Sequence, residues 1–358
     1  MKIKKLFLVF GALLINLTML IIVLSRLSHL NLHIVKLQHA FTPDNENSFD
    51  NEIDKIMSSY NIQTNTTCLF NFSFSDTTIN KVLTRWRTAK PQEKMLTISL
   101  KGRLGNHMFQ YASLLGIAFL SGRVPVLENS LTTQSLTTLF NISFIGNVKK
   151  EDMIRFDETN YASYDCQLYN LSDSNIEIKG YMQSWKYFYS IRAIIRKEFT
   201  FVQKYKDLSA QCFQKYTGQY GNRTVVGFHV RRTDMIRDWK LGYTSAPLSY
   251  MLKAMRHMKT KFRDPIFLIA TDDKRWCREN LQFPDVVLMD NTNPYLDFAT
   301  LTLCDHMIVT VGTFGWWVAW LGNGYTVYYK DYPRAGSWLA SHFTDDDYFM
   351  PDWVPLGA

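Results

Sequence analysis

The stretch Val225-Val-Gly-Phe-His229-Val-Arg231-Arg232-Thr-Asp234 decides the fold. Residues 225–230 are mostly apolar and have the length of a strand, as in a sheet that is covered on both faces. Two guanidinium groups and a carboxylate follow directly after this strand. Because parallel α/β sheets bind ligands beyond the carboxyl ends of their strands, the stretch predicts an α/β fold with a ligand site after Val230.

The same alternation of strand and helix patterns continues on both sides of this stretch. Further buried strands are expected at Met95 to Leu100, Pro265 to Ala270, Val286 to Met289 and His306 to Val311. Helical patterns are expected from near Asn106 and at Ser249 to Lys261, Arg275 to Asn280 and Leu296 to Cys304. Alternating strands and helices predict a parallel sheet, and a chain of 358 residues with 46% hydrophobic content is long enough for two domains.

Arg231 and Arg232 suggest what the site binds. A guanidinium group matches phosphate oxygens with two parallel hydrogen bonds. When a nucleotide-sugar donor gives up its sugar, the leaving group is a nucleoside diphosphate. A fixed guanidinium group stabilises the negative charge that develops on this diphosphate. The alternative is a strand end at which solvated arginines pair with Asp234.

Two glycine turns, each between an expected strand and an expected helix, offer backbone N–H groups to an anion. They are Gly102-Arg-Leu-Gly105-Asn106 and Gly312-Thr313-Phe314-Gly315. Glycines of ordinary tight turns are the alternative. The tryptophans after the second turn are more often core residues than a platform for sugars; they are Trp316, Trp317 and Trp320.

The N-terminus contains an apolar run, Leu6 to Leu24, that is long enough to cross a bilayer. We expect a membrane anchor here, and a cleaved signal peptide is the alternative. Basic residues precede the run at Lys2, Lys4 and Lys5, which predicts a cytoplasmic N-terminus and a luminal remainder.

Further features agree with a luminal location. Beyond the apolar run, five Asn-x-Ser/Thr sequons predict glycosylation at Asn65, Asn71, Asn141, Asn170 and Asn222. Five cysteines allow up to two disulfides, and none of them has metal-site spacing. The formal charge of +8 is scattered and forms no long basic run, which argues against nucleic-acid binding.

Taken together, these segments resemble the galactoside α-1,2-fucosyltransferases of glycosyltransferase family 11, inverting enzymes that transfer L-fucose from GDP-β-L-fucose to the 2-hydroxyl of a galactoside. The resemblance is carried by Gly102-Arg-Leu-Gly-Asn-His-Met-Phe-Gln-Tyr-Ala112, Gly180-Tyr-Met-Gln-Ser-Trp-Lys-Tyr-Phe188, His229-Val-Arg-Arg-Thr-Asp234, Ala270-Thr-Asp-Asp273 and Val309-Thr-Val-Gly-Thr-Phe-Gly315. The sequence departs from the family at His107, where the family usually has Gln.

The resemblance implies a GT-B-like fold of two Rossmann-type lobes with parallel sheets behind an N-terminal transmembrane helix, and no metal or other cofactor. The expected organisation is a cytoplasmic tail (1–5), a transmembrane signal-anchor (6–25), a luminal stem (26–94), an acceptor-side lobe (95–224) and a GDP-fucose-binding lobe (225–358). The implied location is the Golgi membrane, with a galactose-terminated glycan on a glycoprotein or glycolipid as acceptor.

The resemblance also implies roles for individual residues. Arg231 would hold the donor diphosphate, and the other donor-binding candidates are Gly102, Gly105, Asn106, His229, Arg232, Asp234, Asp272, Asp273, Thr313 and Phe314. Gln183 and Trp185 are the candidates for acceptor binding. The catalytic base stays open between Asp238, which we favour, and Asp234, and the enzyme can instead rely on stabilising the leaving group.

Two other functions fit parts of the sequence. The acidic run Asp345-Asp-Asp347 has the spacing of a metal-dependent transferase that uses another nucleotide sugar. The aromatic residues Tyr181, Trp185 and Trp239 would suit a membrane-tethered glycan-binding protein without turnover. Such a protein leaves the two arginines and the two glycine turns without a purpose.

Overall fold

The computed structural model describes residues 74, 76–90, 93–169 and 171–358. The expected anchor at Leu6 to Leu24 and the sequons at Asn65, Asn71 and Asn170 lie outside these residues. Within the described part of the chain, no helix combines the length and the apolar character that a membrane crossing needs.

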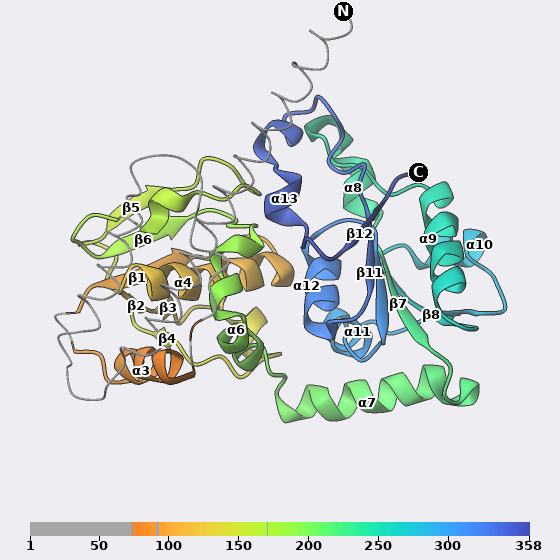
Figure 1. Ribbon diagram of the computed structural model, residues 1–358, viewed down its shortest axis with the longest axis horizontal. Helices are drawn as coiled ribbons and strands as arrows, with labels where there is room; N and C mark the ends of the chain where they lie inside the picture. The colour runs from red at the N-terminus through yellow and green to blue at the C-terminus, as the bar shows by residue number, and fades with distance from the viewer. Residues whose placement is uncertain (1–73, 75, 91–92, 170) are drawn as a thin grey trace, which may run out of the picture. The chain divides into compact units, whose positions relative to one another are not determined.

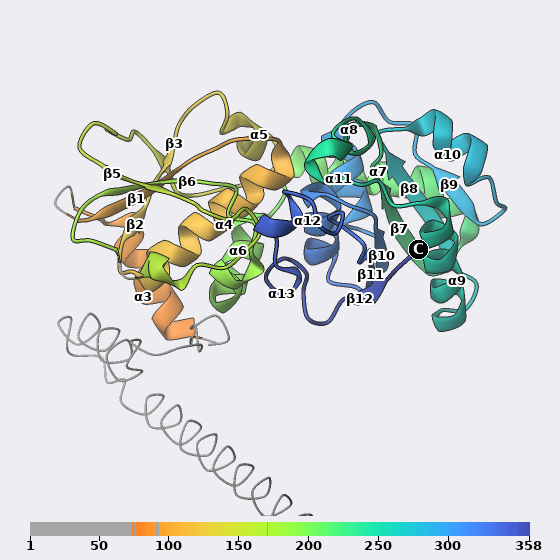
Figure 2. The same ribbon diagram turned by 90° about the horizontal axis from the view of Figure 1, so that it is seen from above.

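Two large parallel sheets, together with a two-stranded parallel sheet formed by β3 and β4, organise the described residues (Figures 1 and 2). The first has the order β2-β1-β6-β5, and we call it and its helices the N-terminal lobe. The second has the order β12-β11-β10-β7-β8-β9, and we call it and its helices the C-terminal lobe. The predicted α/β fold with parallel sheets is therefore confirmed.

The N-terminal lobe begins with a helix and continues with short strands. Its elements are α3 (Asp76–Arg87), β1 (Met95–Ser99), α4 (Leu104–Leu120), β2 (Val124–Pro125), β3 (Leu127–Glu128), α5 (Gln134–Thr137), β4 (Ile145–Gly146), β5 (Ile154–Asp157), β6 (Ile176–Lys179) and α6 (Arg192–Glu198). Short 3₁₀ turns lie at Cys166–Tyr169, Trp185–Tyr187 and Tyr189–Ile191.

The C-terminal lobe alternates strands and helices along the chain. Its elements are α7 (Gln203–Thr217), β7 (Val225–Val230), α8 (Thr233–Arg237), α9 (Leu248–Lys261), β8 (Ile266–Thr271), α10 (Lys274–Asn280), β9 (Val286–Leu288), α11 (Pro294–Leu301), β10 (His306–Val309), α12 (Thr313–Gly322), β11 (Thr326–Tyr329), α13 (Asp345–Tyr348) and β12 (Val354–Leu356). Figure 1 shows α9 and α10 on one face of the sheet and α11 and α12 on the other.

The residues that form the central strands are those expected from the sequence. Every residue of β7 is buried, as is all of β8 except its last residue, because helices cover both faces of the sheet. Turn chemistry sets the helix starts. Asn293 caps α11 by accepting a 2.9 Å hydrogen bond from the Tyr295 N–H, and Pro294 fills the first turn.

Three segments differ from the expected organisation. The helix α3 falls within the range expected to be stem, yet it packs on the N-terminal lobe, where the indole of buried Trp86 donates a 2.9 Å hydrogen bond to the Arg123 carbonyl. The helix α7 falls within the range of the N-terminal lobe but packs against α11. Near the end of the chain, Phe343 forms a bridge with Ala162, so this segment returns to the N-terminal lobe.

Aromatic side chains fill the contact between the lobes, where α4 packs against α12. The Phe109 ring lies 4.5 Å from the Trp316 ring and 5.0 Å from the Trp317 ring, measured between centroids. Trp316, Trp317 and Trp320 are all buried. Of the two interpretations of these tryptophans, the structure confirms the core.

Candidate functional site

A cavity of about 210 Å³ opens where the carboxyl ends of the strands of both lobes meet. Gly102 and Arg103 follow β1, Arg231 and Asp234 follow β7, and Gly312 and Thr313 follow β10; all six line the cavity. Parallel sheets present their ligands at this edge. The cavity is therefore the candidate site predicted from Arg231 and the two glycine turns.

Arg231 and Asp234 form the charged centre of the cavity. Nε of Arg231 donates a 2.9 Å hydrogen bond to Oδ1 of Asp234, and Nη2 donates to Oδ2. Burial alone would raise the pKa of Asp234, but the hydrogen bonds and charge of Arg231, together with Arg103, lower it. No hydrogen bond among the described residues uses Nη1 of Arg231, so this nitrogen can donate to a ligand.

The helix α12 begins at the cavity wall with backbone geometry that only glycine adopts easily. Gly312 has φ +88°, and a Cβ placed on it would lie 3.2 Å from Cδ of Arg231. No side chain caps the helix, and Gly312 and Thr313 at its start line the cavity, so the N–H groups of its first turn are not used by a cap. This arrangement suits an anion such as a phosphate.

The first glycine turn joins the two lobes at the cavity. Oδ1 of Asn106 accepts hydrogen bonds from Nε2 of Gln183 at 3.0 Å and from Oγ1 of Thr313 at 2.9 Å. A Cβ added to Gly105 would lie 2.6 Å from the backbone carbon of Thr313, so only glycine allows α4 and α12 to approach this closely. Asn106, Gln183 and Thr313 all line the cavity.

Buried polar side chains of α4 hold the loops around the cavity. Gln110 accepts a 3.1 Å hydrogen bond from the Lys101 N–H and donates one of 2.6 Å to the Gly180 carbonyl. Ser113 donates to the Met182 carbonyl. The carboxyl oxygens of Glu158 accept hydrogen bonds from the N–H groups of Tyr181 and Met182. These contacts fix the loop that carries Gln183.

Several predicted donor-binding residues lie beside the cavity but do not line it. His229 is buried against the Phe314 ring, with 4.8 Å between centroids, and burial together with Arg231 lowers its pKa to about 3. Arg232 turns away and lies 3.7 Å over the Trp276 ring, with Nε 3.3 Å from Asp273. His229 and Arg232 therefore support the residues that line the cavity and do not line it themselves.

Asp272 and Asp273 serve local structure. Asp272 accepts hydrogen bonds from the N–H groups of Arg232 and Thr233 and from the Thr233 hydroxyl. Asp273 caps α10 by accepting from the Trp276 N–H at 3.1 Å. Both carboxylates are therefore already engaged in holding the loops after β7 and β8.

Trp185 was expected to bind the acceptor, and the structure corrects this expectation. Its side chain is buried, its indole donates a 3.2 Å hydrogen bond to the Asp346 carbonyl, and it does not line the cavity. Of the two acceptor candidates in this segment, Gln183 therefore lines the cavity and Trp185 belongs to the core.

The favoured base, Asp238, lines the cavity but is already paired. Arg237 binds both of its oxygens, at 3.0 and 2.8 Å, and these hydrogen bonds lower the pKa of Asp238. Asp234, the other base considered, is held in the same way by Arg231. A carboxylate with a lowered pKa is a weak proton acceptor.

Sequence reasoning missed part of the cavity lining. Arg103 lies inside the first glycine turn, with Nη2 3.8 Å from Asp234, and its place in the quoted motif could have identified it. Tyr181, also in the lining, was a glycan-binding candidate from the sequence. The other aromatic lining residues have no comparable sequence signal because they come from many loops; they are Tyr161, Tyr243, Tyr332, Phe343 and Tyr348.

The acidic run at Asp345 to Asp347 contributes an internal ion pair. Asp347 accepts a 2.6 Å hydrogen bond from Nζ of Lys186 and one of 2.8 Å from the Tyr164 N–H, and it is buried. Among the described residues, no group of three or more His, Cys, Asp or Glu side chains has an arrangement that could hold a metal ion.

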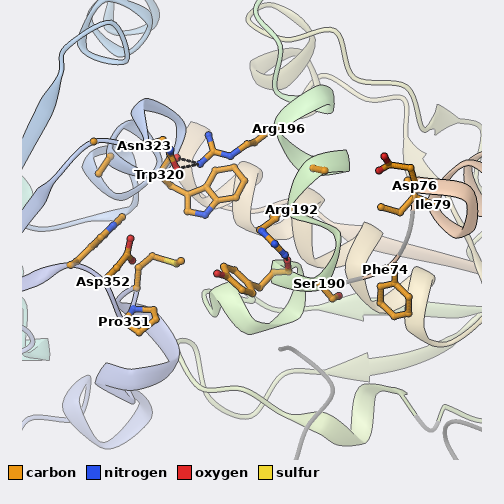
Figure 3. A pocket seen from close by; sticks show the side chains of 16 residues that line it. Phe74, Asp76, Ile79, Ser190, Arg192, Arg196, Trp320, Asn323, Pro351 and Asp352 are labelled. Carbon is orange, nitrogen blue, oxygen red and sulfur yellow. Dashed lines mark hydrogen bonds between the residues drawn. The ribbon is translucent and has the colours of Figure 1, made fainter. Parts of the chain in front are cut away.

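A second cavity, of about 590 Å³, contains none of the predicted site residues (Figure 3). It lies at the other end of α12, roughly 15 Å away at 1.5 Å per residue. Arg196 caps this end by donating to the carbonyls of Trp320 and Leu321 and to Oδ1 of Asn323. We interpret this larger cavity as a gap left by the packing of the two lobes. The smaller cavity, lined by Arg231, is the candidate active site.

The two sequons that the structure describes carry exposed asparagines, Asn141 and Asn222. Cys166 is exposed and Cys212, Cys277 and Cys304 are buried, and none of these four is in a disulfide; Cys68 lies outside the described residues. Use of the sequons stays a prediction.

Comparison with known proteins gives a consistent result. Residues 63–357 match the profile of the family described as glycosyl transferase family 11. The chain is 32% identical over 282 residues to galactoside 2-alpha-L-fucosyltransferase Sec1 of Mus musculus, covering 75% of each chain. It is 33% identical over 286 residues to galactoside alpha-(1,2)-fucosyltransferase 1 of Rattus norvegicus, again covering 75% of each.

A crystal structure of the NodZ alpha-1,6-fucosyltransferase soaked with GDP-fucose overlaps 67% of this chain and 96% of that chain, with 13% identity and a TM-score of 0.46. Family membership rests on the sequence matches, which extend through both lobes. The chain belongs to glycosyl transferase family 11 and is a glycosyltransferase.

Proposed function

We propose that the protein transfers L-fucose from GDP-β-L-fucose to the 2-hydroxyl of a terminal β-galactoside, with inversion at the sugar carbon. The relatives that support this proposal are named galactoside 2-alpha-L-fucosyltransferase and galactoside alpha-(1,2)-fucosyltransferase. The acceptor is a glycan on a glycoprotein or glycolipid.

The observation that carries the proposal is the position of Arg231. Asp234 fixes the orientation of its guanidinium group, and its Nη1 stays available beside Gly312 and the start of α12. When the bond to fucose breaks, negative charge develops on the diphosphate of GDP. A guanidinium group and a helix N-terminus that already face this position stabilise the charge without reorganising.

The same arrangement supports transfer without a metal ion. In metal-dependent transferases a divalent cation neutralises the leaving diphosphate. Here Arg231 supplies a fixed positive charge, and the acidic run that would hold a metal is engaged through Asp347 and Lys186. Transfer without added metal is part of the proposal.

In this mechanism, removal of the proton from the acceptor hydroxyl contributes less to the rate than stabilisation of the leaving diphosphate does. Asp238 is the candidate acceptor for the proton, because it lines the cavity and is more accessible than Asp234. Its pairing with Arg237 weakens it as a base, so stabilisation of the leaving group and positioning of the hydroxyl carry most of the rate enhancement.

The apolar run Leu6 to Leu24 supports an anchored, type II location. We propose a Golgi membrane protein whose lobes face the lumen, with GDP-fucose bound mainly by the C-terminal lobe and the acceptor glycan by the N-terminal lobe.

The test uses the full chain in detergent with GDP-fucose, a panel of β-galactosides and EDTA. We expect a new α-1,2-linked fucose, identified by NMR, and its loss in Arg231→Ala. Transfer from another nucleotide sugar but not from GDP-fucose would refute the proposal that GDP-fucose is the donor. A need for Mn²⁺ or Mg²⁺ would favour the metal-dependent alternative, and the absence of any transfer or GDP-fucose hydrolysis would favour a glycan-binding protein.

A further inference from the structure

Two exposed tryptophans lie beside the candidate cavity. The chain has nine tryptophans, all within the described residues, and only Trp239 and Trp338 are exposed, at 53% and 50%. Large apolar side chains that gather on a surface mark binding sites more often than isolated ones do. Ile236, in α8, and Leu241, in the short 3₁₀ helix that begins at Trp239, are also about half exposed.

The loops that carry the two tryptophans are bonded to each other. The Gly242 carbonyl accepts a 3.0 Å hydrogen bond from the Arg334 N–H, and the Leu241 carbonyl accepts one of 3.1 Å from the Leu339 N–H. A Cβ on Gly242 would lie 2.1 Å from Oγ of Ser337, so the loops meet at a glycine. We call the surface formed by Trp239 and Trp338 the aromatic ledge.

Neighbouring side chains hold the ledge in place. The Trp338 ring lies 5.4 Å from the Tyr161 ring and 4.6 Å from the His342 ring, measured between centroids. The Ser341 hydroxyl donates a 2.7 Å hydrogen bond to the Trp338 carbonyl. The guanidinium group of Arg334 lies 5.4 Å from the Trp239 ring centroid. A ring that is exposed and yet fixed loses little conformational entropy when a ligand stacks on it.

The ledge continues the wall of the cavity. Asp238 and Leu339, the immediate neighbours of Trp239 and Trp338, line the cavity, and so does Tyr161, which contacts Trp338. At about 210 Å³ the cavity is smaller than the roughly 300–1,000 Å³ of pockets that enclose a whole ligand. An acceptor longer than one sugar must therefore extend past the rim.

We propose that the aromatic ledge is an acceptor subsite, which binds the sugar that follows the reacting galactose in the acceptor glycan. This proposal rests on the proposed function and specifies its substrate class as oligosaccharides rather than simple galactosides. The C–H face of a pyranose is apolar and packs flat on an indole ring. Arg334 and His342, beside the rings, offer hydrogen bonds to the hydroxyls at the sugar's edge.

The kinetic test compares methyl β-galactoside with a β-galactoside extended by two sugars, using the full chain and GDP-fucose. The measured quantity is the ratio of kcat/KM for the extended acceptor to kcat/KM for the short one. We expect Trp338→Ala and Trp239→Ala each to lower this ratio about tenfold, while Trp338→Phe keeps most of it, because the stacking face is retained. Phe283→Ala, at an exposed ring outside the ledge, should leave the ratio unchanged.

A binding measurement tests the ledge without any transfer. In saturation-transfer NMR, protons of the second sugar should receive magnetisation from the unmodified chain and lose it with Trp338→Ala. An unchanged kinetic ratio together with unchanged saturation of the second sugar would overturn the proposal.

The two proposals fail in different ways. If the unmodified chain transfers no fucose to either acceptor, the proposed function fails, whereas the NMR measurement still decides the subsite. If both acceptors react, the ledge variants lower both kcat/KM values equally and the saturation of the second sugar is unchanged, the proposed function stands and the subsite is refuted.

Discussion

Oγ1 of Thr313 donates a 2.9 Å hydrogen bond to Oδ1 of Asn106, which lies 207 positions earlier in the chain. Each residue stands in the first turn of a helix, α12 and α4, and each follows a glycine turn at the end of a strand. The contact therefore joins the two lobes at the point where the cavity forms.

The close backbone approach of Gly105 to Thr313 predicts that one added methyl group has a strong effect. In Gly105→Ala the new Cβ would lie 2.6 Å from Thr313, and α4 and α12 would have to separate. We expect a loss of about 1–3 kcal/mol in the free energy of unfolding, measured by chemical denaturation. Gly322→Ala is the matched control in α12, where the nearest atom is 3.6 Å away; a loss as large as that of Gly105→Ala would contradict this explanation.

A substitution at Asn106 can separate its role in joining the two lobes from its electrostatic effect on a bound diphosphate. Asn106→Asp keeps an oxygen that accepts from Thr313 and Gln183, so stability should stay within about 1 kcal/mol of the parent. The added negative charge faces the proposed diphosphate position and should weaken GDP binding about tenfold, measured by calorimetry. Unchanged GDP affinity would place the diphosphate elsewhere.

The geometry of Arg231 predicts that lysine cannot replace it. Arg231→Lys keeps a positive charge for Asp234 but loses the fork that bonds Asp234 and a ligand at once. We expect kcat/KM for fucose transfer to fall about 100-fold, with the thermal midpoint nearly unchanged. The control is Arg275→Lys on exposed α10, which should leave the rate constant intact; near-parental activity in Arg231→Lys would contradict the assigned role.

Glu158 predicts a pH dependence of stability. Burial raises the pKa of this carboxyl to about 8, although the N–H groups of Tyr181 and Met182 and the charge of Lys101 act in the opposite direction. Between about pH 4.5 and 8 the folded chain then binds more protons than the unfolded chain, so this contribution to stability is lost as the pH rises. Glu158→Gln should flatten the decline between pH 5 and 8 in denaturation experiments.

The control for the pH measurement is Glu279→Gln, at an exposed carboxyl paired with Arg275, which should keep the slope of the parent chain. A parental slope in Glu158→Gln would show that Glu158 is ionised throughout the folded state.

Much of the C-terminal lobe could be predicted from local sequence alone. Runs such as 225–230 and 265–270 are too apolar for a solvent-exposed face and too short for a helix, and the structure has strands at Val225–Val230 and Ile266–Thr271. Arg231, after Val225–Val230, and Thr313, after the strand His306–Val309, both line the cavity. Hydrophobic periodicity and the rule for ligands at parallel strand ends were sufficient here.

Only the tertiary structure decided which members of each motif face the cavity. Arg231 and Arg232 are adjacent in sequence, yet one lines the cavity and the other lies on Trp276, because successive residues after a strand point in different directions. Gln183 and Trp185 divide in the same way between cavity and core. The sequence by itself determined the strands, the glycine turns and the charged residues. The partners of those residues, and the aromatic lining drawn from distant loops, depend on contacts between the lobes, which no local pattern encodes.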